Sequence, residues 1–275
     1  MTKDYTVQAF QELPSSYYST TYLMISTLEL NNKVSCWSYQ GPIANFYYSY
    51  DATNWQQFKV DYSGNTGGHT EIWLNALHPY VYFKRTETAG YISWPNATFQ
   101  ITKKYNLSGK LSSIYTGNLN DISLTNYKDL SPNFKYFRDT PVVSARYLNL
   151  NIDTACFQGM FKGCTYLDYP PAVSHILKSC NSGFAEMYSG CTSLTRINVF
   201  NADLEYAQYI CANTYYDCSK IKMSTSGVAP YSERWQVGSA AWNGSGTGGM
   251  FVNTGGSFQY PTYPNTWYYT SNELV

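Results

Sequence analysis

The front part of the chain alternates apolar and polar residues with a period of two. From Tyr22 to Gly117, short runs of this kind are separated by turn-forming residues such as Gly41-Pro42 and Ser63-Gly64. A period of two places successive side chains on opposite faces of a strand. The runs are YLMIS, KVSCWS, NFYYSY, WQQFKV, TEIWLNA, YVYFKR, TFQIT and KLSSIY. About eight strands at such short spacing indicate a β-sandwich or a small barrel.

The pattern then changes to a repeat of 27 residues. MFKGCTYL, which begins at Met160, returns as MYSGCTSL from Met187 and as TYYDCSKI from Thr214. Seven positions hold this period: Phe157/Phe184/Cys211, Met160/Met187/Thr214, Phe161/Tyr188/Tyr215, Gly163/Gly190/Asp217, Cys164/Cys191/Cys218, Thr165/Thr192/Ser219 and Leu167/Leu194/Ile221. A period of roughly 20 to 29 residues is typical of leucine-rich-repeat-like stacking, in which each unit buries its apolar side against its neighbours. We therefore expect a short solenoid.

Each repeat begins with a helical spacing of apolar residues. Phe157, Met160, Phe161 and Cys164 lie at i, i+3, i+4 and i+7, which predicts one face of a short helix. Gly163 is expected to end that helix, because glycine takes the left-handed conformation at little steric cost.

A strand-like segment is expected after the cysteine. Leu194, Ile197 and Val199 are apolar, and Arg196 and Asn198 lie between them on the side that faces water. Residues Val143, Leu148 and Leu150 belong to an earlier, degenerate unit. The sequence thus predicts roughly four stacked units, or rungs.

The repeat resembles a known family. Phe-x-x-Met-Phe-x-Gly-Cys-Thr-x-Leu is similar to the BspA-type leucine-rich repeat, which occurs in surface proteins of gut and oral Bacteroidales and in fibre or virion proteins of phages that infect them. YSYDATNW, from Tyr48, followed by VYFKR resembles the β-module that precedes such repeats, and NLSGKLSSI, from Asn106, resembles the hinge that closes it. The arrangement Trp235-x-x-Gly238, GMFV and Pro264-x-x-Trp267 resembles the family's C-terminal β-cap.

These patterns predict a mainly β fold with short helices. We expect an extended N-terminal arm at 1–21, a β-sandwich at 22–117, BspA-like leucine-rich repeats at 118–226 and a β C-terminal cap at 227–275. A cap is expected because the last rung of a solenoid otherwise exposes an open edge.

Charge and composition limit the classes of partner that the protein can bind. Eighteen Lys and Arg balance eighteen Asp and Glu, and charged residues make up only 13% of the chain, so no basic footprint for nucleic acid is present. The 29 tyrosines suit either the packing of strands or an adhesive surface, because tyrosine combines a flat apolar face with a hydroxyl. Both readings remain open at the level of sequence.

The seven cysteines do not form a metal-binding pattern. No C-x-x-C pair occurs, and Cys164, Cys191 and Cys218 occupy one repeat column, so we expect them to be buried core residues. Disulfides remain open for Cys156, Cys180 and Cys211, although the pattern favours a reduced protein. No metal or other cofactor is expected.

The chain contains no signal for export or membrane insertion. The segment MTKDYTVQAFQELP lacks an apolar core, and no 18-residue apolar run occurs. We therefore expect no membrane insertion and a virion location, with assembly in the host cytoplasm. The alternative is the bacterial cell surface.

No catalytic motif is present. His69, His78 and His175 lie far apart in sequence and outside any triad or metal-protease context. The glycine-rich segment from Gly244 lacks the Lys-Ser/Thr of a P-loop, and no carboxylate pair is singled out by its spacing. The protein is expected not to be an enzyme.

Two groups of residues are candidates for binding. On the strand side of the solenoid, aromatic, amide and arginine side chains are expected to project from a rigid ladder, which suits contact with a glycan or a protein receptor. These are Tyr147, Asn149, Tyr169, Arg196 and Asn198. The predicted N-terminal arm offers a possible anchor to a partner protein through Tyr5, Phe10, Tyr17 and Tyr18.

The expected function is that of a non-enzymatic virion structural protein. The resemblance implies a tail fibre or fibre-like appendage subunit of a bacteriophage, used for host attachment or for bridging virion proteins. The residues beyond Arg234 contain several large aromatic residues and only one charged residue, Glu273, which favours a homo-oligomer, with a trimer the commonest arrangement among such fibres. The alternatives are a BspA-type bacterial surface adhesin and a depolymerase of surface glycan.

Overall fold

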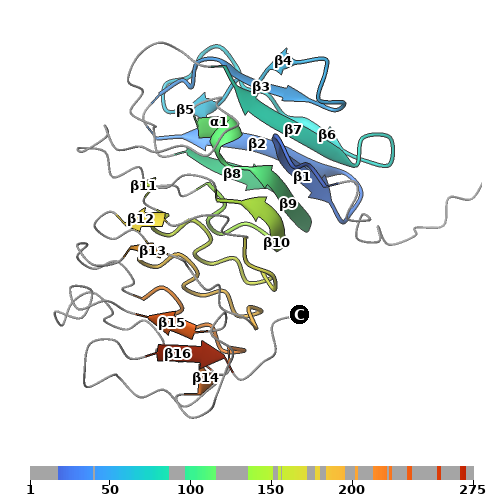
Figure 1. Cartoon of the computed structure of the whole chain (residues 1–275). Helices are drawn as coiled ribbons and strands as arrows, with labels where there is room; N and C mark the ends of the chain where they lie inside the picture. Colours follow the sequence, from blue (N-terminus) through green and yellow to red (C-terminus); the bar gives the residue numbers. More distant parts are fainter. Residues whose placement is uncertain are drawn as a thin grey trace, which may run out of the picture.

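A computed structural model gives the structure of the chain. It describes residues 18–39, 41–86, 97–115, 136–150, 154–155, 157–171, 177–179, 184–195, 202–203, 213–221, 223–224, 234–236, 253–254 and 267–270. Within these residues the protein is mainly β, with one short helix, α1 (Ser112–Tyr115). The predicted fold class is confirmed. Figure 1 shows the sheets of the N-terminal part above a stack of short rungs.

A six-stranded sheet forms one layer of the N-terminal part. Its order is β10-β9-β1-β7-β3-β4, and every neighbouring pair is antiparallel except β9 and β10. The strands are β1 (Leu23–Thr27), β3 (Phe46–Ser49), β4 (Gln56–Gln57), β7 (Tyr80–Arg85), β9 (Tyr105–Lys110) and β10 (Val142–Asn149).

A second, smaller sheet is organised around β2 (Asn32–Ser38). One edge of β2 pairs with β8 (Ala97–Ile101). On the other edge, β6 (Ile72–Leu74) pairs with the start of β2 and β5 (Asp61–Tyr62) pairs with its end.

The two sheets enclose one apolar core. Phe83 of the six-stranded sheet packs edge-to-face on Phe99 of the second sheet, with ring centroids 5.2 Å apart. Alternation explains the packing, because Leu23, Ile25 and Val34 point inward while their neighbours in the strands point outward. The N-terminal part is therefore a β-sandwich.

The segment after residue 105 differs from its prediction. The expected hinge is instead β9, a strand inside the six-stranded sheet, and KLSSIY forms α1 where a strand was predicted. Gly109 has a φ of 88°, and a Cβ there would collide with the carbonyl oxygen of Tyr22. Ser113 holds α1 on the sheet, since its Oγ accepts from Leu23 N–H (2.8 Å) and donates to the Phe83 carbonyl (3.2 Å).

The apolar residues at the start of each repeat form a run of turns. The predicted short helix of each repeat is therefore wrong. Phe161 N–H donates to Met187 O in the next rung (2.9 Å), and Gly163 N–H donates to Ser189 O (2.8 Å). These donors are therefore unavailable to a helix. Gly163 is left-handed, as predicted, with a φ of 76°, but Gly159 is left-handed as well (63°) and breaks the run four residues earlier.

The strand segments of the rungs pair in parallel. β11 (Thr154–Ala155), β12 (Leu177–Ser179) and β13 (Ala202–Asp203) form a three-stranded sheet in that order. Leu194 and Thr195 lie outside any strand, and the rest of the strand expected after Leu194 lies outside the described residues.

A small antiparallel sheet follows the rungs. Its order is β14-β16-β15, with bounds Met223–Ser224, Trp267–Thr270 and Arg234–Gln236. These strands lie within or next to the segment predicted to be a β-cap.

Strand β10 connects the sandwich to the rungs. It extends the six-stranded sheet by pairing with β9, and its Ser144 forms a parallel bridge with Tyr169 of the first full repeat. The core is one continuous cluster that extends from Leu23 to Ile221. The predicted boundary between residues 117 and 118 therefore does not correspond to a break in the packing.

A column of stacked aromatic rings runs through this junction. Phe99 of β8 stacks on Phe137, followed by Phe161, Tyr188 and Tyr215, with centroids 5.4 to 5.8 Å apart and interplanar angles of 3° to 15°. Phe137 begins the degenerate rung to which Val143 was assigned, although Phe137 itself was not predicted to be part of it. Its spacing to Phe161 is 24 residues instead of 27, and Thr140 occupies the position of the cysteine.

The cysteine column lies in the core, as predicted. Cys164, Cys191 and Cys218 are free thiols with no exposed surface. Each Sγ donates to the carbonyl oxygen of the aromatic residue in the preceding rung, at 2.9, 3.1 and 3.1 Å, where the acceptors are Phe137, Phe161 and Tyr188. The thiols thus add a hydrogen bond between rungs, in addition to filling space.

Candidate functional site

Tyr147 lies on the outer face of the six-stranded sheet. It is opposite Ser108 of β9, which is in turn opposite Met24 of β1, so all three side chains share one face. The core-facing residues Ile25 and Leu107 alternate with them. The sandwich and the first rungs therefore hold Tyr147 on a strand that belongs to both.

Tyr18 stacks on Tyr147. The two ring centroids are 4.4 Å apart at 23°, and Asn106 Nδ2 donates to the Tyr18 hydroxyl at 3.5 Å. Ser19 N–H donates to Ser108 Oγ (3.2 Å), and only 7% of Tyr18 is exposed. Tyr18, near the end of the predicted arm, is thus buried against its own chain.

Arg146 joins the same cluster. Its Cζ lies 5.7 Å from the ring centroid of Tyr147 and 5.8 Å from that of Tyr169, both within cation–π range. The register of β10 shifts between Ser144 and Tyr147, and a bulge of this kind re-aims side chains. Arg146 was not predicted as a site residue, because an undisturbed alternation places it on the opposite face from Tyr147.

We call Tyr18, Arg146, Tyr147 and Tyr169 the tyrosine cluster. It unites one predicted anchor residue with two predicted strand-face residues. Asn149, at the end of β10, is opposite Lys110, and its carbonyl accepts from Leu111 N–H (3.0 Å). The other predicted site residues lie outside the described residues: Tyr5, Phe10, Tyr17, Arg196 and Asn198.

The sheet beneath Tyr18 carries buried polar groups. Ser26 and Asn106 are opposite each other on β1 and β9 and are 2% and 3% exposed. Among the described residues, neither Ser26 Oγ nor Asn106 Oδ1 has a hydrogen-bond partner. Such groups cost about 1 to 3 kcal/mol each when they are buried unpaired. The outer face below the tyrosine cluster is thus polar and incompletely satisfied.

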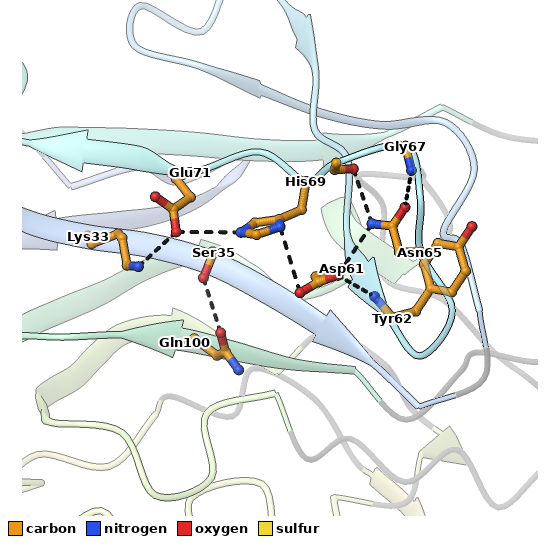
Figure 2. A network of polar contacts seen from close by, with 10 residues as sticks. Lys33, Ser35, Asp61, Tyr62, Asn65, Gly67, His69, Glu71 and Gln100 are labelled. Carbon is orange, nitrogen blue, oxygen red and sulfur yellow. Dashed lines mark hydrogen bonds and ion pairs between the residues drawn. The ribbon is translucent and has the colours of Figure 1, made fainter.

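A second polar group lies on the outer face of the smaller sheet (Figure 2). Lys33 Nζ is 2.7 Å from Glu71 Oε1, whose other neighbour is His69 Nε2 at 3.4 Å. His69 Nδ1 lies 3.7 Å from Asp61 Oδ2. The hydrogen bond from Lys33, supported by His69, lowers the pKa of Glu71. The imidazole is thus held between two carboxylates.

This arrangement is not a catalytic triad. Both contacts of His69 are to carboxylates, whereas nucleophilic catalysis needs a hydroxyl or thiol beside the imidazole. The free cysteines of the described chain are buried, and burial raises the pKa of Cys164 and Cys218 to about 12. Such thiols are poor nucleophiles at neutral pH.

Two further searches cover only the described part of the chain. Among those residues, no group of three or more His, Cys, Asp or Glu side chains is placed to hold a metal ion. None of the helices described there has the length and apolar character that crossing a membrane requires.

Comparison of the chain with protein-family models, with curated proteins and with solved structures gives no match.

Proposed function

We propose that the protein is a non-enzymatic structural protein of a bacteriophage virion, a subunit of a tail fibre or fibre-like appendage. In this proposal it attaches the particle to the surface of its host or bridges other virion proteins. The resemblance of the repeats to BspA-type units supports the choice of biological setting. The tyrosine cluster on β10 is the observation that carries the binding role.

The cluster has the chemistry of a recognition surface. Tyrosine and arginine contribute large contact areas and hydrogen bonds, and they are enriched where proteins bind other proteins. Tyr147 and Tyr169 are half-buried and Arg146 is exposed, so their accessible parts face solvent. Their backbone is tied on both sides, because β10 pairs with β9 and Ala145 N–H donates to Tyr169 O (2.8 Å). A rigid backbone limits the entropy that is lost on binding.

The proposed partners are other virion proteins and a receptor on the host surface. Copies of the chain are also proposed to associate, with a trimer as the arrangement most typical of fibres. A BspA-type bacterial surface adhesin would use the same surface in a different location. The experiment therefore has to separate location from binding.

Location is tested on particles of a Bacteroidales phage whose genome encodes the chain. Mass spectrometry of purified particles is expected to find the protein, and antibodies against it are expected to decorate an appendage in electron micrographs. Detection in the surface fraction of uninfected cells, with none in particles, would instead establish the adhesin.

Binding is tested by competition for adsorption. Purified protein is expected to slow phage adsorption, and the double variant Arg146→Ala, Tyr169→Ala is expected to lose this effect while keeping its melting temperature. Tyr166→Ala is the matched control, because Tyr166 is an exposed aromatic residue of the same rung outside the tyrosine cluster. Equal competition by the double variant and the wild type would remove the tyrosine cluster from the binding role.

A further inference from the structure

The outer face of the smaller sheet carries an exposed tryptophan. Trp73 is 52% exposed, whereas its neighbours Ile72 and Leu74 in β6 are at most 1% exposed. Alternation along the strand therefore points the indole away from the core. About half of this large ring is open to solvent, so it is available to a ligand.

Polar side chains surround this ring in rows across the sheet. Lys33 of β2 is directly opposite Trp73, and Ser35, two residues further along, is opposite Gln100 of β8. Ser35 Oγ donates to Gln100 Oε1 (3.3 Å), and the Gln100 side chain is exposed. Figure 2 shows Glu71 and His69 on one flank of β2 and Gln100 on the other, with Lys33 and Ser35 of β2 between them.

The far end of the face carries another aromatic residue. Trp37 follows Ser35 on the same side of β2 and is half-buried, and it is opposite Asp61 of β5. Four residues of strand separate the Trp73 row from the Trp37 row, a span of about 14 Å. The face is thus an elongated strip with an indole at each end and hydrogen-bonding groups between them.

The charges on the strip are held in place by one another. Lys33 pairs with Glu71, and His69 lies between Glu71 and Asp61. Asn65 Nδ2 bonds to Asp61 Oδ1 (3.3 Å), and its own Oδ1 accepts from Gly67 N–H (2.9 Å), so the loop before His69 is braced as well. One ammonium group stands against two carboxylates, so the strip has no excess of positive charge that would attract an anionic ligand.

We propose that this strip, defined by Lys33, Ser35, Trp37, Glu71, Trp73 and Gln100, binds a neutral glycan chain. The apolar C–H face of a sugar ring stacks on the indole of Trp73, as apolar groups do on aromatic faces. The sugar hydroxyls exchange hydrogen bonds with Lys33, Glu71 and Gln100. Each hydroxyl both donates and accepts, so it suits a mixed row of ammonium, carboxylate and amide groups.

The surroundings of Trp73 favour a glycan over a protein partner. The centre of a protein–protein interface is a contiguous apolar area, whereas Trp73 has charged and amide neighbours on the same face. In the described chain, the large apolar side chains that are exposed are Tyr39, Trp73, Leu77 and Tyr166. Of these, only Trp73 lies within a strand of the smaller sheet.

This proposal is independent of the virion role and of the tyrosine cluster. The strip lies on the smaller sheet, whereas the tyrosine cluster lies on the outer face of the six-stranded sheet. Glycan binding would hold equally for a phage protein and for a bacterial surface protein. Failure of one proposal therefore leaves the other standing.

The test is affinity electrophoresis of the full chain in native gels. The gels contain one of four neutral polysaccharides (mannan, xylan, mixed-linkage β-glucan or dextran) or polygalacturonate as an acidic one. We expect at least one neutral polysaccharide to retard the protein and polygalacturonate to leave its mobility unchanged. Trp73→Ala is expected to weaken retardation at least about tenfold, and Gln100→Ala to weaken it less.

Two controls keep the outcome clear. Tyr166→Ala, an exposed aromatic substitution outside the strip, is expected to run like the wild type. The melting temperature of each variant is measured, and Gln100→Ala replaces Trp73→Ala as the deciding variant if the latter fails to fold. The proposal is overturned if no neutral polysaccharide retards the protein, or if only polygalacturonate does. It is also overturned if the deciding variant, Trp73→Ala or Gln100→Ala, is retarded as strongly as the wild type.

Discussion

The sandwich and the rungs pack their aromatic rings in different ways. In the sandwich, Phe58 meets Phe46 at 78° and Phe83 at 89°, and Phe83 meets Phe99 at 64°. In the rungs, equivalent rings stack at 8° and 14°. In the sandwich the rings come from non-equivalent positions, and Phe46 and Phe83 of one sheet also stack at 27°, whereas successive rungs repeat one ring by translation. Both geometries are favourable for aromatic pairs.

The same contrast holds for hydrogen bonds. In the sandwich, Asn32 joins segments about seventy residues apart, since its Nδ2 donates to Lys103 O (2.9 Å) and its Oδ1 accepts from Lys103 N–H (2.9 Å). In the described part of the rungs, the backbone and thiol donors bond within their own unit or to an adjacent one. The sandwich is therefore expected to unfold as one unit, whereas the rungs are stabilised by nearest-neighbour contacts.

The largest expected effect comes from Gly109→Ala, near the end of β9 in the six-stranded sheet. A methyl group at this left-handed position meets the Tyr22 carbonyl, so β1 and β9 have to separate. We expect a loss of more than about 4 kcal/mol in the free energy of unfolding, measured by urea denaturation and circular dichroism. Because β10 pairs with β9, the rungs should lose their protection from hydrogen exchange as well.

Gly190→Ala is the matched control for that substitution. Gly190 is left-handed too, with a φ of 77°, but a Cβ there finds no atom closer than 3.6 Å. Its cost is therefore conformational strain alone, about 1 kcal/mol. Similar losses for the two variants would show that steric contact with Tyr22 is unimportant.

Phe161→Ala breaks the aromatic column in the middle of the rungs. The side chain is fully buried between Phe137 and Tyr188, and its removal is expected to cost about 3 kcal/mol. Hydrogen exchange should rise in residues 157–195 while β1, β2 and β7 keep their protection. Uniform loss of protection across both regions would contradict the nearest-neighbour description of the rungs.

Cys191→Ser has a smaller expected effect. The thiol donates to Phe161 O at 3.1 Å, and a serine hydroxyl has the same acceptor within reach, so the substitution does not leave the hydroxyl unpaired. We expect a cost of about 1 kcal/mol for serine and about 2 kcal/mol for alanine, which loses both the bond and the volume. Thermal denaturation distinguishes the two, and a serine variant that is less stable than the alanine variant would refute the hydrogen bond.

The last prediction concerns the dependence of stability on pH. Burial raises the pKa of the Cys164 thiol from 9.0 to about 12, so the unfolded chain releases this proton first. The resulting stability is complete below pH 9 and declines as the pH rises toward 12. Cys164→Ala should therefore show a shallower decline in stability between pH 9 and pH 11 than the wild type. Parallel pH profiles would contradict the raised pKa.

The core of the rungs was largely predictable at positions where successive rungs carry the same or a similar residue. The columns of Phe161 and Cys164 identified the core, and Gly163 identified a left-handed position. The helix prediction failed because amphipathic spacing does not reveal where backbone N–H groups find acceptors. Here the acceptors belong to the next rung. Phe137 was not assigned to the degenerate rung because the spacing of that rung is shorter and its cysteine is replaced by threonine.

The candidate site was predictable only in part. Tyr147 and Tyr169 were identified because they project between buried positions of the strand side. Arg146 depends on a shift in the register of β10, and the contact of Tyr18 joins segments more than a hundred residues apart. The polar strip around Trp73 combines β2, β6 and β8 and has no local motif. Contacts of this kind become visible only when the pairing of strands is known.

The 24-residue step from Phe137 to Phe161 also has an evolutionary consequence. The stack accepts a unit three residues shorter than its successors without losing ring contact or the thiol bond, since Cys164 still donates to Phe137 O. Length variation is therefore absorbed outside the stacked turn. Gene duplication or deletion of a whole unit would change the distance between the sandwich and the C-terminal sheet by one ring spacing, while both end structures keep their sequences. A lineage of such proteins could thus diversify in reach by recombination within a single gene.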